Sequence, residues 1–314
     1  MSRRVIRIAT RKSDLAMWQA RHVASLLEKN HSELVVELVP LVTEGDRILD
    51  KPLSMIGGKG LFLKELERAL LEQQADLAVH SMKDVPVEET PGLLCDVMLN
   101  RANAADAWLS HSGSGIDSLP AGSVVGTSSL RRQAQLLHRR PDLKVADLRG
   151  NVNTRLRKLD EHQYDAIILA CAGLERLGMA DRITEILSPP DWLPASAQGT
   201  IGLQYREQDD ELLDIVRNLG DPDTQSVTRA ERAAATALDG SCTLPLAIYA
   251  QLFDEEMQIS GMVGEKDGKR ILRGECRGPS SEPENLGRKL AADLLAQGAG
   301  NIIAATHASS ESGP

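Results

Sequence analysis

The sequence predicts an α/β protein with a small α+β domain at its carboxyl end, on three observations. Short apolar strands alternate with amphipathic helical segments from Val5 to about Leu174. Basic and polar turns follow several of those strands, where open α/β sheets bind their ligands. Beyond residue 221 the alternation gives way to one helix, three β runs and a last helix. The alternating part should build a mostly parallel sheet covered on both faces.

The first part of the chain opens directly on a strand. Ser13 and the Asp that follows it form a helix start after this strand, and Leu66 and Leu70 give a later segment one apolar face. Pro86 and Pro91 exclude a helix after the strand that ends near residue 80. We expect strands at 5–10, 34–42, 76–80 and 93–99, and helices from about 14 to 28 and from 61 to 72.

The second part repeats the pattern after a crossing segment at 100–106. A Pro-rich break at 188–194 closes it, and residues 200–205 read as a strand that returns to the first sheet. The expected strands are 123–126, 144–148 and 165–171, and the expected helical segments are 129–140, 152–161 and a turn at Leu174.

The third part begins with an Ala-rich helix from Asp221 to Leu238. Turn signals at Asp254 and around Gly268 separate three β runs, which should form an antiparallel sheet with a helix at 284–297. These runs are 246–253, 256–263 and 270–277. The domains are therefore expected to be residues 1–99 with 200–217, residues 105–193, and residues 221–314.

Composition excludes several classes of protein. A net charge of −9 and a pI near 5.4 argue against nucleic acid as a partner, because binding it needs a basic surface. A strand begins at once and no apolar run is long enough to span a membrane, so we expect a cytoplasmic protein that binds no membrane. The four cysteines are widely spaced and show no metal-ligand pattern, so we expect neither a disulfide nor a metal.

Residues 127–158 hold the strongest local charge. They carry nine Lys or Arg and two Asp, which gives this segment a net charge of +7. Because the whole chain has a net charge of −9, the other residues together have a net charge of −16. A strand runs into Thr127 and Ser129, which are good capping residues for the next helix. Hydroxyls, free amides, Arg131 and Arg132 would then meet at one helix N-terminus, which suits a carboxylate or a phosphate.

Two interpretations stay open for the cations of this segment. Arg131, Arg132, Arg149 and Arg155 lie close to strand-to-helix turns, so we favour anion binding for them. A solvated basic face fits a second set about equally well, namely Arg139, Arg140, Arg157 and Lys158.

Cys242 and Asp84 are candidates for chemistry. Cys242 lies in a helix-to-strand loop, unlike the cysteines in apolar β runs, and could serve as a thiolate nucleophile or covalent anchor. No His lies near it in the sequence. Asp84 follows a strand beside Lys83, and its plain interpretation is a salt-bridged loop acid. A cationic pocket facing a carboxylate and a thiol would suit a polyanionic substrate that passes through a cationic intermediate.

Five motifs occur in the order and spacing of one enzyme family. They are Gly-Gly-Lys-Gly-Leu-Phe at 57–62, His-Ser-Met-Lys-Asp-Val-Pro at 80–86, Gly-Thr-Ser-Ser-Leu-Arg-Arg at 126–132, Leu-Arg-Gly-Asn-Val with Thr-Arg-Leu at 148–156, and Gly-Ser-Cys at 240–242. Across essentially its whole length, the chain resembles the porphobilinogen deaminase (hydroxymethylbilane synthase) family. The resemblance implies two lobes like those of type II periplasmic binding proteins around a cleft, and a third domain with an anchoring cysteine.

The resemblance also implies a reaction. Family members condense four porphobilinogen molecules head to tail, losing ammonia through an azafulvene, and release hydroxymethylbilane for tetrapyrrole (haem and porphyrin) biosynthesis. The chain grows on a dipyrromethane cofactor held by a thioether, which here falls on Cys242. The product would pass to uroporphyrinogen III synthase, and the protein is expected to be a monomer. Each pyrrole carries two carboxylates, which guanidinium forks bind well.

Residue roles follow from the same resemblance. Asp84 would face the pyrrole N–H groups and stabilise positive charge. The cofactor-binding residues would be Ser13, Lys83, Thr127, Ser129, Arg131 and Arg132. The substrate-binding residues would be Arg11, Gln19, Lys59, Arg149, Arg155, Arg176 and Gln198.

The sequence departs from the family pattern at a few positions: Met55, Ala105, Ala197, Thr200 and Ser241. Ala105 replaces a usual Arg, and Ser241 replaces a glycine beside the anchor. The alternative function is a cytosolic two-lobed anion-binding module without turnover. It accounts for the cleft and the arginines, but it gives no role to Cys242 and Asp84 together.

Overall fold

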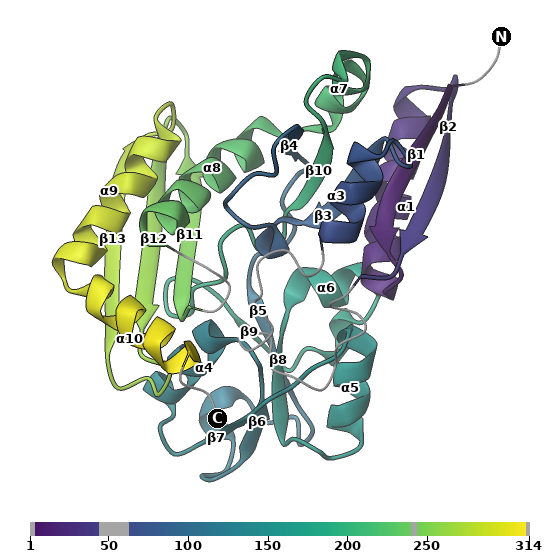
Figure 1. The fold of residues 1–314 in the computed structure, drawn as a ribbon. Coiled ribbons are helices and arrows are strands. Elements are labelled where there is room, and N and C mark those ends of the chain that lie inside the picture. Colours follow the sequence, from purple (N-terminus) through teal and green to yellow (C-terminus); the bar gives the residue numbers. More distant parts are fainter. Residues whose placement is uncertain (1–3, 44–62, 240–243, 312–314) are drawn as a thin grey trace. The chain divides into compact units, whose positions relative to one another are not determined.

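The computed structural model of the chain describes residues 4–43, 63–239 and 244–311 (Figure 1). The chain divides into two compact units. Unit 1 consists of residues 1–49, 59–102 and 199–225, and unit 2 of residues 50–58, 103–198 and 226–314. The further division of unit 2 into residues 105–193 and 221–314 stays a prediction.

Unit 1 contains a five-stranded sheet with the order β2-β1-β3-β10-β4. Its strands are β1 (Arg4–Arg11), β2 (Leu34–Leu41), β3 (Leu77–Ser81), β4 (Leu93–Met98) and β10 (Ile201–Arg206). Strand β1 runs parallel to β2 and β3, whereas β10 is antiparallel to β3 and β4. The helices are α1 (Asp14–Asn30), α3 (Lys64–Leu71) and α7 (Asp210–Val216), with short 3-10 turns η2 (Met82–Asp84) and η5 (Arg217–Leu219). The predicted return of residues 200–205 to the first sheet is confirmed.

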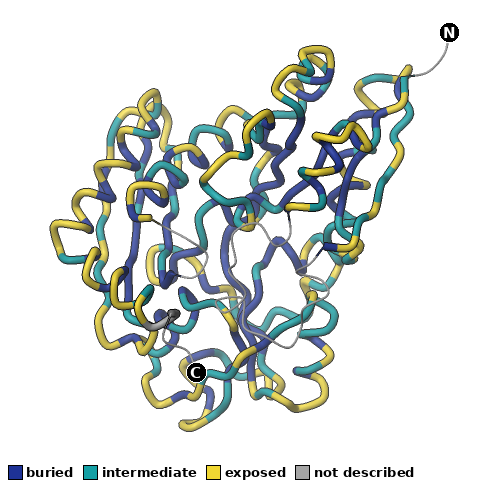
Figure 2. The backbone as a smooth tube through the Cα atoms, in the orientation of Figure 1, coloured by how far each residue is buried: buried dark blue, intermediate teal, exposed yellow. Residues whose placement is uncertain are grey.

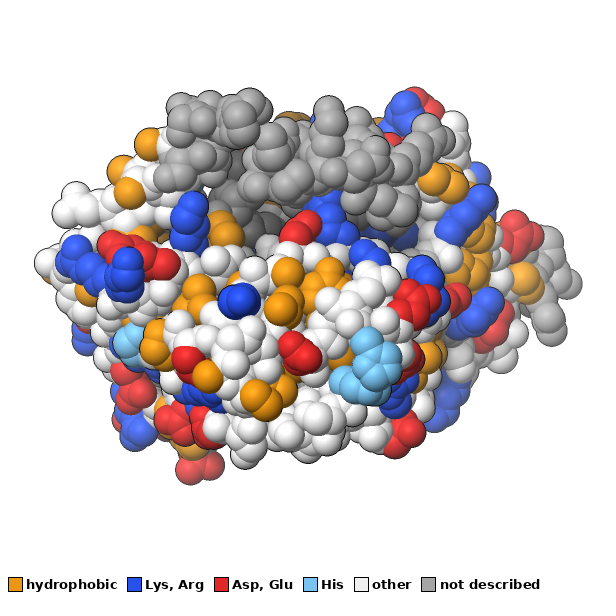
Figure 3. Space-filling view, turned by 90° about the horizontal axis from the view of Figure 1, so that it is seen from below, with side chains coloured by type: hydrophobic (Ala, Val, Ile, Leu, Met, Phe, Trp, Pro, Cys, Tyr) orange, Lys and Arg blue, Asp and Glu red, His pale blue; other side chains and the backbone are white. Residues whose placement is uncertain are grey.

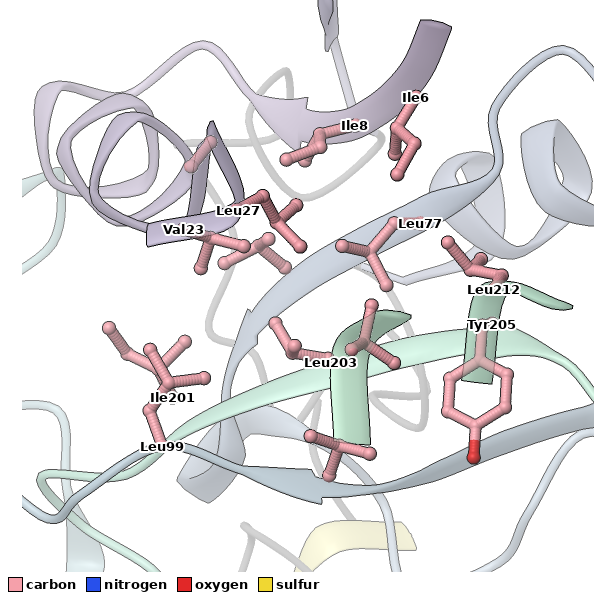
Figure 4. Close-up of a cluster of buried hydrophobic side chains, with 14 of the residues drawn as sticks. Ile6, Ile8, Val23, Leu27, Leu77, Leu99, Ile201, Leu203, Tyr205 and Leu212 are labelled. Atoms are coloured by element: carbon pink, nitrogen blue, oxygen red, sulfur yellow. The ribbon is translucent and has the colours of Figure 1, made fainter. Parts of the chain in front are cut away.

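The core of unit 1 is aliphatic, as the scarcity of aromatic residues requires. Ile6 and Ile8 of β1 pack with Leu27 of α1, Leu77 of β3 and Leu203 of β10 (Figure 4). Each of these side chains is at most 1% exposed. Burial of this kind contributes about 1.5–3 kcal/mol for each large aliphatic side chain, and it fixes the strand ends that carry polar residues.

Unit 2 contains a second five-stranded sheet, with the order β7-β6-β8-β5-β9. Its strands are β5 (Asp106–Ser110), β6 (Val124–Gly126), β7 (Lys144–Ala146), β8 (Ala166–Ala170) and β9 (Glu185–Leu187). Its helical segments are α4 (Leu130–Arg139), α5 (Val152–Asp160), α6 (Cys171–Arg176), η3 (Ile116–Ser118) and η4 (Ala180–Arg182). Strand β6 runs parallel to β7 and β8, and β5 is antiparallel to β8 and β9.

Both sheets therefore follow one plan, in which three parallel strands are extended by two more through antiparallel pairings. The α/β class is confirmed. Four of the five strands in each sheet run in the same direction, as expected of a mostly parallel sheet, and the one reversed strand, β10 or β5, makes two of the four pairings antiparallel. Strands β5 and β9 were not predicted. The start of β5 was interpreted as part of a crossing segment, and β9 lies directly before the Pro-rich break at 188–194.

The carboxyl-terminal part of unit 2 holds the predicted three-stranded antiparallel sheet, with the order β11-β12-β13. Its elements are α8 (Pro222–Ala237), β11 (Leu246–Phe253), β12 (Glu256–Gly264), β13 (Ile271–Pro279), α9 (Pro283–Ala296) and α10 (Ala299–Glu311). Helix α9 packs on this sheet, where Gly261 and Gly274 leave room for the side chains of Leu290 and Leu294. Figure 2 shows buried residues concentrated along the strands and exposed residues on the outer sides of the helices. Helix α10 was not predicted.

Candidate functional site

The basic turns of unit 2 lie at one edge of its five-stranded sheet. Strands β6, β7 and β8 are parallel, so their carboxyl ends meet at this edge. Strand β5 runs the other way and begins there, because Asp106 pairs with Ala170, the last residue of β8. The carboxylate of Asp106 is thus placed beside the turns that carry the arginines.

The first basic turn connects β6 to α4. Ser129 caps α4, since its hydroxyl accepts a hydrogen bond from the backbone N–H of Arg132 at 3.4 Å. Thr127 is buried, and its hydroxyl accepts from the N–H of Ser129 at 3.2 Å. Gly126 is required by packing, because a Cβ there would lie 2.8 Å from Cδ1 of Tyr164. The predicted capping residues therefore hold the start of α4 as expected.

Arg131 and Arg132 extend from this turn onto Asp106. Nη1 of Arg131 donates to Oδ2 of Asp106 at 2.7 Å, and Nη2 of Arg132 donates to Oδ1 at 2.7 Å. Two neutral donors complete the shell: Nε1 of Trp192 lies 2.8 Å from Oδ2, and Nε2 of Gln198 lies 2.9 Å from Oδ1. One carboxylate thus accepts four hydrogen bonds from three segments of unit 2.

This cluster is buried and carries a net positive charge. Arg131 and Arg132 are 4% and 6% exposed, and Asp106 is fully buried. Burial alone would raise the pKa of Asp106, but the two guanidinium groups outweigh it and hold that pKa far below its usual range. Two cations against one anion leave a charge of +1. Among the described residues, the buried Nε of Arg132 has no hydrogen-bond partner.

The second basic turn connects β7 to α5. Asn151 caps α5 by accepting from the N–H of Thr154 at 2.8 Å, and Nε of Arg155 donates to the carbonyl oxygen of Gly150 at 2.8 Å. Arg149 is half-buried, with its Nε 4.0 Å from Oδ2 of Asp147. The structure thus brings Arg149 and Arg155 to the same turn.

Ser128 ties the two turns together. Its hydroxyl donates to the carbonyl oxygen of Leu148 at 2.7 Å and lies 3.2 Å from the N–H of the same residue. The hydroxyl of Tyr164 donates to the carbonyl oxygen of Asp147 at 2.6 Å. The turns that carry the four favoured arginines are therefore one connected structure.

Two further predicted residues lie in unit 2. Arg176 is on α6, and burial lowers its pKa to about 10, so its guanidinium group remains charged at neutral pH. Gln198 is buried and, besides Asp106, donates to the carbonyl oxygen of Ala104 at 2.7 Å. Gln198 therefore belongs to the buried cluster rather than to an exposed wall.

Unit 1 presents a second group of predicted residues at the carboxyl ends of β1 and β3. Ser13 caps α1, accepting from the N–H of Ala16 at 3.4 Å, and Nε2 of Gln19 donates to the hydroxyl of Ser81 at 2.8 Å. Arg11 ends β1 and is half-buried.

Lys83 and Asp84 lie in the turn η2 that follows β3. Lys83 is half-buried, and Asp84 is exposed. A carboxylate in this position is open to a ligand. Lys59 and Cys242 lie outside the described residues, as do Met55 and Ser241.

The other departures from the family pattern have local roles. The N–H of Ala105 donates to Oδ1 of Asn103 at 3.0 Å, and the N–H of Ala197 donates to Oε2 of Glu231 at 2.5 Å. Ala197 adopts a left-handed conformation with a φ of 57°, which normally favours glycine. In unit 1, the carbonyl oxygen of Thr200 accepts from the N–H of Met82 at 3.0 Å.

The arginines for which we left a solvated face open lie in ion pairs with surface carboxylates. Arg139 pairs with Asp117, and Nη1 of Arg157 lies 2.9 Å from Oε1 of Glu161. Nη2 of Arg140 lies 2.6 Å from Oδ2 of Asp142. Basic and acidic side chains are intermixed on the face drawn in Figure 3.

Asp106 and Trp192 were missed by the sequence analysis. The signal that was available was an acidic residue directly before the apolar run of β5. It could not show that the strand begins at the same sheet edge as the arginine turns.

Neither a metal-binding cluster nor a membrane-spanning helix is present among the described residues. No group of three or more His, Cys, Asp or Glu side chains there could hold a metal ion. In the same residues, no helix combines the length and the apolar character needed to cross a membrane.

Several solved structures are similar to part of this chain at low identity. An ancestral cationic amino acid solute binding protein is 16% identical, with a TM-score of 0.44, over 68% of this chain and 87% of that chain. The BenM effector binding domain, solved with benzoate, is 13% identical with a TM-score of 0.42, over 70% and 93%. The periplasmic VFT2 domain of BvgS from Bordetella pertussis is 15% identical with a TM-score of 0.40, over 68% and 86%.

Two family descriptions match nearly the whole sequence. The "Porphobilinogen deaminase, dipyromethane cofactor binding domain" matches residues 6–214. The "Porphobilinogen deaminase, C-terminal domain" matches residues 226–296. The chain therefore belongs to the porphobilinogen deaminase family, and it is a transferase of tetrapyrrole biosynthesis that works with a dipyrromethane cofactor.

Proposed function

We propose that this chain is a hydroxymethylbilane synthase, which joins four porphobilinogen molecules head to tail on a dipyrromethane held by Cys242. The observation that carries the proposal is the buried cluster of Arg131, Arg132 and Asp106. It lies within the segment matched by the cofactor-binding domain, and it has an excess positive charge.

The residues of this cluster fit a pyrrole carboxylate. An isolated buried charge of +1 is costly unless an anion balances it. The unpartnered Nε of Arg132 can donate to an incoming oxygen, and Ser129 and Thr127 lie at the same turn. A carboxylate bound here would also meet the N-terminus of α4. The chemistry of the donors is therefore that of a carboxylate receptor.

When bound, the dipyrromethane supplies the pyrrole carbon on which the chain grows. The residues that would hold the carboxylates of the cofactor are Ser13, Lys83, Thr127, Ser129, Arg131 and Arg132. Those that would hold the carboxylates of the incoming units are Arg11, Arg149, Arg155 and Arg176. Gln19 and Gln198 position their neighbours, because each donates to a residue at a strand end. Lys59 is proposed as a further substrate contact.

Asp84 is proposed to act on the reacting pyrrole. Positive charge develops on this ring as ammonia leaves, and a carboxylate beside its N–H groups stabilises that charge more than the neutral ring. The exposed position of Asp84 after β3 supports this role, since the carboxylate is open to a ligand. The same group can accept and return a proton at the ring nitrogen.

We infer that the protein is a cytoplasmic monomer and that it releases hydroxymethylbilane to uroporphyrinogen III synthase. Residues 1–99 with 200–217, 105–193 and 221–314 would be its three domains.

Intact-protein mass tests the covalent part of the proposal. The purified protein should be heavier than its sequence by two condensed porphobilinogen units, and Cys242→Ala should remove this increment. An active enzyme with an unmodified Cys242 would refute the anchoring role.

Steady-state formation of hydroxymethylbilane tests Asp84. We expect Asp84→Asn to keep the cofactor mass but to lose about a hundredfold or more in turnover. Asp84→Glu should lose less, because it keeps the charge in a displaced position. Near wild-type turnover in a cofactor-loaded Asp84→Asn protein would return Asp84 to the salt-bridged loop acid considered from the sequence.

A further inference from the structure

Asp106 has been given no role of its own in ligand binding, yet its carboxylate accepts four hydrogen bonds within the buried cluster. Its two oxygens accept from Arg131, Arg132, Trp192 and Gln198 at 2.7 to 2.9 Å. One cation would be enough to neutralise the charge of Asp106, whereas four donors bond to it. The arrangement therefore fixes the direction of the carboxylate as well as its position.

The two guanidinium groups are fixed in turn. Nη1 of Arg131 donates to Asp106 and also to the carbonyl oxygen of Leu193 at 2.7 Å. Arg132 donates to Asp106 through Nη2 and to the carbonyl oxygen of Ile168 through Nη1 at 2.8 Å. Each planar group is thus held at two points, so its orientation is set before any ligand arrives.

Trp192 and Gln198 hold Asp106 in addition to the arginines. Both are neutral donors, and each bonds to a different oxygen of the carboxylate. Gln198 is anchored by a further bond to the carbonyl oxygen of Ala104. The Asp106 carboxylate is therefore held by two neutral donors as well as by the two cations.

The charge of the cluster limits what it can bind. Asp106 takes one N–H group from each guanidinium and cancels one of the two positive charges. The remaining +1, with the unpartnered Nε of Arg132, suits one carboxylate and not two.

We propose that Asp106 is a positioning residue, which holds Arg131 and Arg132 as a single rigid receptor for one carboxylate of a pyrrole side chain. The identity of that ligand rests on the proposed function, whereas the receptor itself rests on the contacts of unit 2. The competing explanation is that Asp106 only balances buried charge and has no effect on ligand binding.

A carboxylate titration separates the two explanations. The probe is propionate, added to nitrogen-labelled Cys242→Ala protein while the Nε–H resonances of the arginines are followed by NMR. We expect saturable shifts for Arg131 and Arg132 in this protein. The substitution Asp106→Glu, introduced into the same Cys242→Ala protein, keeps the negative charge but moves it by one methylene. This double variant should bind propionate at least about tenfold more weakly.

Two further variants complete the design. Asp106→Asn removes the charge and should weaken the site at least as much, if the protein folds. The matched control, Asp117→Asn, removes the surface partner of Arg139 and should leave propionate binding unchanged. Unchanged binding in a folded Asp106→Glu protein, or no saturable response of the two arginines in the parent protein, would overturn the proposal.

Cofactor content gives a second readout. In the presence of Cys242, Asp106→Glu should reduce the fraction of protein carrying two pyrrole units, by intact mass, and Asp117→Asn should not. If the parent protein binds propionate through Arg131 and Arg132 but never carries pyrrole units, the proposed function fails and the receptor stands. If every variant carries two pyrrole units on all of its molecules, the positioning role of Asp106 fails and the proposed function stands.

Discussion

Helix α4 carries an Arg-Arg pair at each end, and the two pairs have opposite surroundings. Arg131 and Arg132 in its first turn are buried against Asp106. Arg139 in its last turn, and Arg140 directly after it, pair with surface carboxylates. The same dipeptide thus lies in a buried ion-pair cluster at one end of the helix and in surface ion pairs at the other.

The difference follows from where each end of the helix lies on the sheet. The start of α4 follows β6 at the carboxyl edge, where the antiparallel strand β5 also begins with an acid. Cations at a helix start are opposed by the helix dipole, so they need a carboxylate to hold them there. Cations at the helix end are favoured by the dipole and need no buried partner. An arginine cluster is therefore best interpreted by its place on the sheet rather than by its charge.

The largest expected difference is in stability. Asp106→Leu leaves two buried guanidinium groups without their anion and should lower the free energy of unfolding by about 3–5 kcal/mol. Asp117→Leu removes an exposed partner and should cost less than about 1 kcal/mol. Urea denaturation of both variants measures this contrast, and equal losses would mean that the burial of the first pair has no energetic weight.

The next contrast concerns elongation. Arg149→Leu and Arg155→Leu should each remove about 2–5 kcal/mol from the binding of successive pyrrole units, because a carboxylate loses its partner. Arg139→Leu and Arg140→Leu should leave elongation close to that of the wild type. Single-turnover analysis of enzyme-bound intermediates by mass checks this, and the division fails if all four variants accumulate the same species.

A smaller effect is expected where the end of α4 meets the hairpin between β12 and β13. Nδ1 of His138 donates to the carbonyl oxygen of Gly268 at 2.9 Å. Gly268 has a φ of 71°, and a Cβ there would lie 2.4 Å from the backbone nitrogen of His138. Gly268→Ala should therefore lower the free energy of unfolding by about 1–3 kcal/mol.

The comparison for this prediction is Gly113→Ala, where φ is also positive but nothing lies within 4 Å of the added Cβ. It should cost less than Gly268→Ala in thermal denaturation. Similar losses would show that the backbone conformation matters and the packing against α4 does not.

The dependence of stability on pH gives the last contrast. Arg131 and Arg132 hold the pKa of Asp106 well below its unfolded value of about 3.9, so the stabilisation is complete above that pH. It is lost progressively as the pH falls below about 4 toward the folded pKa. Acid titration of unfolding should show a shallower loss for Asp106→Asn than for the wild type, and identical slopes would contradict this assignment.

The regular elements could be predicted from the sequence because their signals are local. The alternation of strands and helices, Ser129 and Asn151 as caps, and the sheet β11-β12-β13 all follow from short-range patterns. Strand β9 ends directly before the Pro-rich break at 188–194, which favours irregular structure, and β5 begins with a buried acid that looks like part of a turn.

The contacts of the site could not be predicted to the same extent. The polar turns indicated an anion site, but the sequence separation between Asp106 and Arg131 gives no sign that they touch. That contact depends on β5 running antiparallel beside β8. The partners of the surface arginines could not be predicted from sequence distance either. Arg140 bonds to a carboxylate two residues away, whereas Arg139 bonds to one on η3.

The most direct test of the different roles at the two ends of α4 is the intact mass of Arg132→Lys and Arg139→Lys. Both substitutions keep the charge and remove the guanidinium fork. Arg139→Lys should carry two pyrrole units on every molecule, as the wild type is expected to do, and most Arg132→Lys molecules should carry none. Two fully loaded proteins, or an equal loss in both, would contradict the proposal that the buried pair binds the cofactor and the surface pair does not.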